Sequence, residues 1–144
     1  MDRLLIIACS QRKTPVKGYV RAIDRYDGPA FRVLCKYLRE NKNGSLVVLI
    51  LSAKYGLIES QRAIPWYDQR LSHASAERLR PQVLEAARRV LQSRPWQAVG
   101  LCAGEEYRSV VGDLAELIPA GAHLDLLAGG LGKRLAALRD WLRQ

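Results

Sequence analysis

The stretch "SLVVLILSAKYGL", residues 45–57, combines a candidate strand with an unusual exit. Leu46–Leu51 is aliphatic on both faces, which predicts a strand covered by helices on both sides. Two small residues, a lysine, a tyrosine and a glycine follow at once. This exit is either an ordinary solvated turn or a loop that holds Lys54 over an anionic group.

Short aliphatic runs also occur at Leu4–Cys9, Ala98–Ala103 and His123–Ala128. The first is apolar on both faces, as expected for a strand in the interior of a sheet. The last alternates apolar and polar residues, which favours an edge position. Together with Leu46–Leu51, these runs predict four strands.

Amphipathic helical patterns separate the predicted strands. The first begins near Pro29 and ends before Gly44, and the others cover residues 75–92, 105–117 and 131–142. Ser75 is the expected N-cap of the second helix. Pro81 then requires that this helix begin close to it, because proline is best tolerated in a first turn.

The alternation of strands and helices predicts a single α/β domain over residues 1–144. We expect a Rossmann-like fold, with a mostly parallel sheet of four strands or slightly more, flanked by helices. No apolar run approaches the roughly 20 residues that a membrane span needs. Right-handed crossovers would bring every strand exit to one edge of the sheet.

The composition indicates an anionic partner. The 144 residues include 23 lysines and arginines against 14 acidic residues, a net charge of +9. A nucleotide or nucleic acid would be attracted by this charge, although a basic surface without a dedicated partner is the alternative. Three cysteines without a CxxC pair favour reduced thiols in the cytoplasm. The spacing of His73 and His123 indicates no metal site, and we expect no cofactor.

Small residues followed by charged or aromatic ones mark every strand exit, in "ACSQRK", "LSAKYGL", "CAGEEY" and "LAGGLGKR". At a common edge, Lys13, Lys54 and Lys133 would meet backbone amide groups and form an anion-binding rim. The alternative is that turns simply need small residues. Cys9 is either a buried small hydrophobe or a thiol activated by neighbouring Arg12 and Lys13.

The segment "IPWYDQRL", residues 64–71, supplies a second group of candidates. Trp66 and Tyr67 could stack on a base, and Asp68 could act as a general acid or base. The aromatic residues could equally cap the core.

Six motifs in order resemble an uncharacterised bacterial and phage family of YaaA-like domains: "CSQRK", "YDGPAF", "ILSAKYGLI", "YDQRL", "AGEEY" and "GGLGKRLAAL". The Tyr-Gly-Leu loop at residues 55–57, followed by Pro65 and Tyr67, is also similar to the peroxide stress protein YaaA, which is associated with DNA binding. More distantly, "CSQRK" resembles a motif of the archaeosine synthase catalytic domain, which modifies a tRNA base. Two departures are the Trp66 inserted between Pro65 and Tyr67, and the changed glycine spacing of "GGLGKRL".

The leading hypothesis is a small cytoplasmic enzyme that acts on a nucleobase, nucleotide or nucleic-acid component, by base modification or N-glycosidic chemistry. The predicted catalytic residues are Cys9, Ser10, Lys13 and Asp68. The predicted substrate-binding residues are Ser52, Lys54, Tyr55, Gly56, Tyr67, Gly104 and Tyr107. The rival hypotheses are a non-catalytic DNA- or RNA-binding stress-response protein, and a partner-binding module with purely structural loops.

Overall fold

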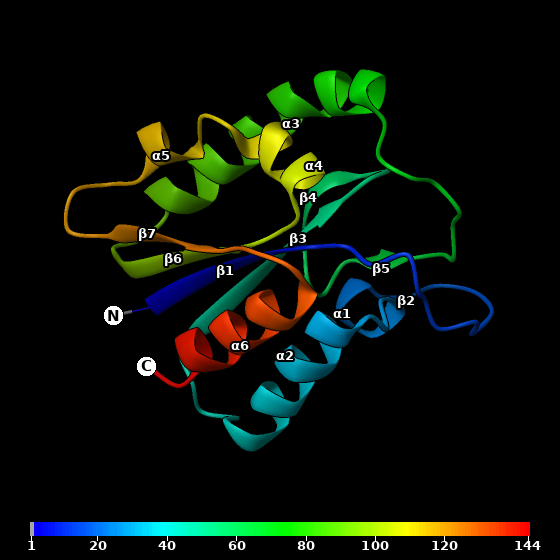
Figure 1. The fold of residues 1–144 in the computed structure, drawn as a ribbon, viewed down its shortest axis with the longest axis horizontal. Coiled ribbons are helices and arrows are strands. Elements are labelled where there is room, and N and C mark those ends of the chain that lie inside the picture. Colours follow the sequence, from blue (N-terminus) through cyan, green and yellow to red (C-terminus); the bar gives the residue numbers. More distant parts are fainter. Residues whose placement is uncertain (1) are drawn as a thin grey trace.

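The computed structural model describes residues 2–144 and contains a five-stranded sheet with the order β4-β3-β1-β6-β7 (Figure 1). The strands are β1 (Asp2–Ala8), β3 (Leu46–Ser52), β4 (Gly56–Glu59), β6 (Trp96–Cys102) and β7 (His123–Leu127). All neighbours are parallel except β3 and β4. This confirms the mostly parallel, Rossmann-like α/β fold, with β7 at an edge and β4 as an additional strand.

Helices cover both faces of the sheet (Figure 1). One face packs against α1 (Ala22–Arg25), α2 (Pro29–Glu40) and α6 (Leu131–Leu142). The other packs against α3 (His73–Gln92), α4 (Glu105–Arg108), the 3₁₀ helix η1 (Ser109–Val111) and α5 (Leu114–Leu117). Successive side chains of β1 point to opposite faces of the sheet. Leu5 is buried in the core beneath α2 and α6, and Leu4 is buried in the core beneath α3. Within residues 2–144, no helix has both the length and the apolar character needed to cross a membrane.

Two helix predictions were wrong in detail. Helix α3 begins before Ser75, because Ser72 is the N-cap and forms a reciprocal capping box with Ser75. Pro81 lies inside the helix, beyond its first turn, on the solvent-facing side where water can reach the unpaired carbonyl group. The single helix expected over residues 105–117 is instead α4, η1 and α5, interrupted at Gly112, a poor helix former.

The stretch quoted at the outset is a β-hairpin rather than a crossover to a helix. Ser52 pairs with Gly56 across the turn, and Gly56 has a φ of +76°. A Cβ atom at Gly56 would overlap the Gln82 side chain. The Gln82 amide accepts a hydrogen bond from the Leu57 N–H (3.1 Å) and donates one to the Leu57 carbonyl oxygen (3.2 Å). Gly56 is therefore needed both for its backbone conformation and for the approach of Gln82.

A second, two-stranded sheet pairs β2 (Val20–Arg21) with β5 (Ala63–Ile64). The fully buried Arg25 donates hydrogen bonds to the carbonyl oxygens of Thr14, Val16, Gly18 and Ile64. One guanidinium group thus fixes the loop after Lys13 to strand β5. The sequence pattern gave no sign of this buried arginine.

Replacing Gly56 with alanine should destabilise the protein by about 2–4 kcal/mol, because left-handed strain adds to the loss of the Gln82 bonds. Gly18→Ala is the matched control: Gly18 has a φ of +82°, but a Cβ atom added there would have no neighbour within 4 Å. We expect this control to cost only about 1 kcal/mol. Urea unfolding measures both, and equal losses would contradict the role of Gln82.

Candidate functional site

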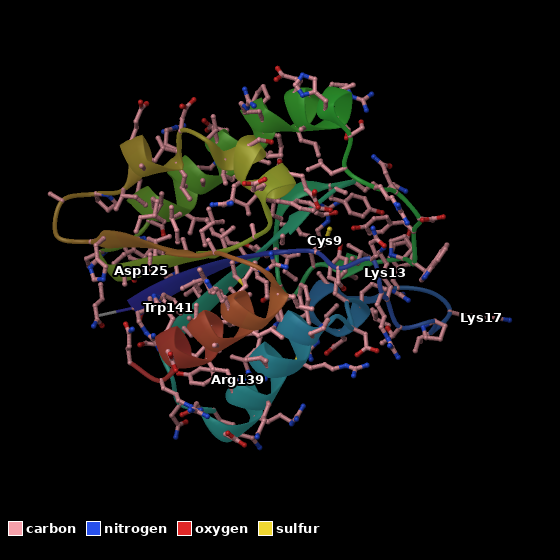
Figure 2. The ribbon with its side chains drawn as sticks, in the orientation of Figure 1. Cys9, Lys13, Lys17, Asp125, Arg139 and Trp141 are labelled. Atoms are coloured by element: carbon pink, nitrogen blue, oxygen red, sulfur yellow. The ribbon has the colours of Figure 1, made fainter. Side chains whose placement is uncertain are left out.

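Two cavities meet around Cys9 at the carboxyl edge of the parallel strands. Figure 2 shows Cys9 and Lys13 following the end of β1. The first, of about 320 Å³, is lined by Lys13 and Arg70, and the second, of about 210 Å³, by Gly104 and Arg134. Both cavities share the same four residues: Cys9, Ser10, Glu106 and Tyr107. The structure therefore brings the exits of β1 and β6 together, as the parallel topology predicts.

Cys9 lies at the junction of the cavities and contacts Tyr107. Its Sγ atom is 3.2 Å from the Tyr107 Oη atom, within hydrogen-bonding distance. Burial, together with the neighbouring Cys9, raises the pKa of Tyr107. The phenol therefore stays protonated at neutral pH and can donate a hydrogen bond to the Cys9 sulfur.

Lys13 and Lys54 both lie within cation–π distance of the Tyr67 ring. Lys13 Nζ lies 4.5 Å from the centroid of the Tyr67 ring, and Lys54 Nζ lies 5.8 Å from it. Lys54 is also 5.4 Å from the Tyr55 ring, which packs edge-on against Tyr67. Cation–π attraction to the electron-rich ring thus helps to hold two like charges near each other.

The position of Tyr67 is set by a buried chain of hydroxyl groups. Ser52 Oγ accepts hydrogen bonds from the N–H groups of Lys54 and Tyr55 (both 3.1 Å), so its own hydrogen is left for Tyr67 Oη at 2.9 Å. The Tyr67 and Tyr26 hydroxyls share a further hydrogen bond of 2.6 Å. The hairpin turn, the loop after β5 and the residues before α2 are therefore tied together beneath the lysines.

Lys13 interacts electrostatically with both Cys9 and Asp68. Burial lowers the pKa of Lys13, whereas its electrostatic interactions with Cys9 and Asp68 act in the opposite direction. Asp68 itself is exposed. The structure thus brings Cys9, Lys13 and Asp68 within electrostatic range of one another, and a lysine with a lowered pKa is a better nucleophile or base at neutral pH.

Ser10 connects the β1 exit to helix α2. Its hydroxyl donates to the Arg12 carbonyl oxygen (2.6 Å) and accepts a hydrogen bond from the Gly28 N–H (3.2 Å). A Cβ atom at Gly28 would lie only 2.6 Å from Ser10 Cβ, so glycine permits this approach. A catalytic role of Ser10 stays a prediction, while these bonds give it a structural one.

The second cavity contains an arginine that sequence reasoning missed. The first turns of α2 and α6 border this cavity, and Arg134 lies in its wall beside Gly104. The neighbouring Lys133, which was expected at the rim, packs its side chain near Gly129 instead. Helical periodicity could have found Arg134, because it precedes the buried Leu138 by one turn and Trp141 by two.

The other predicted binding residues make contacts within the protein. Ser52 and Gly56 are buried. The Tyr55 ring contacts both Lys54 and Arg62, whose guanidinium carbon is 4.9 Å from the ring centroid. Their roles in substrate binding stay predictions. Among residues 2–144, no group of three or more His, Cys, Asp or Glu side chains is placed to hold a metal ion.

The fold and the edge cavities define a Rossmann-like α/β protein with a candidate site at the carboxyl ends of its strands. The chain belongs to a family of unknown function, DUF6884, whose model matches residues 4–140.

The chain is also similar in structure to AF0587, described by its crystal structure as a protein of unknown function. The two share 15% sequence identity with a TM-score of 0.56, and the match covers 99% of this chain and 45% of AF0587. This likeness concerns the fold alone, and the chain spans less than half of AF0587. A search of curated proteins finds no match to the chain.

Tyr67→Phe should cost about 1–3 kcal/mol of stability, because the buried Ser52 and Tyr26 hydroxyls lose their shared partner while the ring remains. Tyr55→Phe is the control, since no hydrogen bond of its hydroxyl is present in the described residues 2–144, and it should cost less than about 0.5 kcal/mol. Urea unfolding compares the two. Similar losses would show that the hydroxyl chain does not stabilise the site.

Tyr26 provides a test by pH. Burial raises the pKa of Tyr26 to about 12, from 10.0. Because the unfolded chain loses this proton first, the stabilising contribution is present below pH 10 and is lost as the pH rises towards 12. The free energy of unfolding of Tyr26→Phe should therefore decrease by about 1 kcal/mol less than that of the wild type between pH 8 and pH 11. This comparison does not depend on the stability of the variant at pH 8. An equal decline, measured by urea unfolding at both pH values, would contradict the shift.

Proposed function

We propose that the protein is a small enzyme that acts on a nucleobase, nucleotide or nucleic-acid component, by base modification or N-glycosidic chemistry. The observation that carries the proposal is the meeting of two cavities at Cys9, with Lys13 in the wall of one and Arg134 in the wall of the other. A thiol and an amine thus lie beside a second cavity, whose wall contains the Arg134 guanidinium as well as the Glu106 carboxylate. A nucleotide has the matching parts, a reactive base or sugar and a phosphate.

The phosphate side of the proposal is supported by the second cavity. Arg134 offers a planar set of donors suited to phosphate, and the first turns of α2 and α6 add the positive ends of two helix dipoles. The open backbone at Gly104 allows close approach. We assign phosphate or another anionic group to this cavity.

The reactive side of the proposal is supported by the first cavity. Cys9 and Lys13 are the candidate nucleophiles, Tyr107 is a hydrogen-bond donor to Cys9, and Asp68 is the candidate acid or base close to Lys13. Lys54, which also lies near the Tyr67 ring, would hold a carbonyl or anionic group. The free cysteines Cys9, Cys35 and Cys102 suit a reducing compartment, which supports a cytoplasmic location.

A second candidate is a nucleic-acid-binding protein without catalytic activity, favoured by the net charge of +9. Such a protein would need the basic surface but neither the Cys9 thiol nor the Asp68 carboxylate. The resemblance of the motifs to YaaA-like domains is compatible with both candidates.

Binding is tested by thermal unfolding with a panel of nucleobases, nucleosides and nucleoside monophosphates. A ligand at about 100 times its Kd should raise the Tm by roughly 5 °C or more. Arg134→Gln should reduce the shift produced by phosphorylated members and leave that of free bases, because it removes only the phosphate contact. Arg139→Gln, on the same helix but outside both cavities, is the control. Absence of a shift with every member would refute the proposal.

Catalysis is separated from binding by Cys9→Ala and Asp68→Asn. For an enzyme, these variants should still show the Tm shift but lose at least about 100-fold in turnover, measured by liquid chromatography of the substrate that the panel identifies. Cys35→Ala is the matched control for the loss of a thiol. If the variants bind as the wild type does and the wild type itself shows no turnover, the non-catalytic candidate is favoured.

A further inference from the structure

A groove with a volume of about 640 Å³ lies between α2 and α6. Four of the residues that line it are basic and one is acidic: Arg32, Lys36, Arg139, Arg143 and Glu40. Figure 2 shows Arg139 on α6, on the side that faces α2. The lining of the groove therefore carries a net positive charge.

Most of these cations have no acidic partner. Arg32 forms an ion pair with Asp27, at 3.2 Å. Within residues 2–144, no ion pair is present for Lys36, Arg139 or Arg143. By contrast, Arg88 and Arg89 on the opposite face of the sheet share the Glu85 carboxylate. Three cations without an ion pair in the part of the chain that the structure describes, Lys36, Arg139 and Arg143, thus lie together in the groove.

The groove continues into the candidate site. Pro29, in the first turn of α2, lines both the groove and the smaller cavity beside Cys9. On α6, Arg134 lines that cavity and the next residue, Leu135, lines the groove. Both helices follow parallel strands, so both begin at the site and lead away from it together (Figure 1). A chain bound in the groove would therefore end at Cys9.

We infer that the α2–α6 groove binds the sugar–phosphate backbone of a single-stranded polynucleotide whose target nucleotide occupies the cavities at Cys9. The inference rests on the proposed function and narrows its substrate from free nucleotides to a polymer. Each 12-residue helix is about 18 Å long, enough for several consecutive phosphates. A single strand is favoured because a base inside a duplex cannot enter a cavity until it is unpaired.

The salt dependence of binding gives the inference a quantitative form. Each neutralised phosphate of a single strand contributes about −0.7 to the slope of log K against log salt concentration. Loss of the Lys36, Arg139 and Arg143 contacts should therefore reduce the magnitude of that slope by about 2. Affinity at about 0.1 M salt should fall at least tenfold.

The test uses fluorescence anisotropy with labelled oligothymidylate and oligouridylate of about 12 nucleotides, at salt concentrations from about 50 to 300 mM. The groove variant is K36E/R139E/R143E. The matched control, R78E/R88E/R89E on α3, has the same change in net charge on the opposite face of the sheet. Urea unfolding confirms that both variants are folded. The four nucleoside monophosphates are measured in parallel by thermal unfolding.

The expected result is weaker oligonucleotide binding and a smaller slope in the groove variant alone, with the mononucleotide shifts kept. Equal weakening in both variants would overturn the inference, because net charge alone would explain binding. Unchanged oligonucleotide binding in the groove variant, with a change from dimer to monomer in sedimentation, would assign the groove to a second copy of the chain and overturn it too. If none of the mononucleotides shifts the Tm of the wild-type protein, the proposed function is refuted, whatever the result for the groove.

Discussion

The hydroxyl chain of Ser52, Tyr67 and Tyr26 is the interaction on which the candidate site depends. Three segments far apart in the sequence meet in it: the end of β3, the loop after β5 and the residues before α2. Because Ser52 also accepts two backbone hydrogen bonds from its own turn, the chain fixes the hairpin and the aromatic ring together. Lys13 and Lys54 then lie over a ring that cannot easily shift. Buried hydroxyl groups thus position the ring that the two lysines contact. Removal of one hydroxyl of the chain leaves its neighbours without a hydrogen-bond partner.

The central sheet could be predicted from the sequence because its signal is local. Runs such as Leu4–Cys9 are aliphatic on both faces, which is typical of a parallel strand between helices. Strand β4 was not predicted, because four residues with a turn before them have too little periodicity to reveal a hairpin. Helix α3 showed the limits of simple rules: Pro81 is accepted inside it, since tertiary packing of the buried Val83 and Ala87 outweighs the local cost of proline.

Much of the candidate site was also predicted, for a topological reason. Once the strands are parallel, their exits must share an edge, so Cys9, Lys13 and Tyr107 had to lie near one another. The residues that were missed act through long-range contacts. Arg25 is recognisable only when the loop that it binds is folded, and Gln82 only when β4 is placed beside α3. Arg134 was overlooked in favour of Lys133, although helical phase separates the two.

The pair of hydrogen bonds between Gln82 and Leu57 has a consequence for association. Strand β4 is an edge of the sheet, and an edge with free N–H and C=O groups can recruit a strand from another molecule. The Gln82 amide occupies both groups of Leu57, in the middle of a four-residue strand, and so takes the place of an incoming backbone. The side chain that shapes the hairpin also blocks strand addition at this edge, and thereby protects the protein against aggregation by sheet extension.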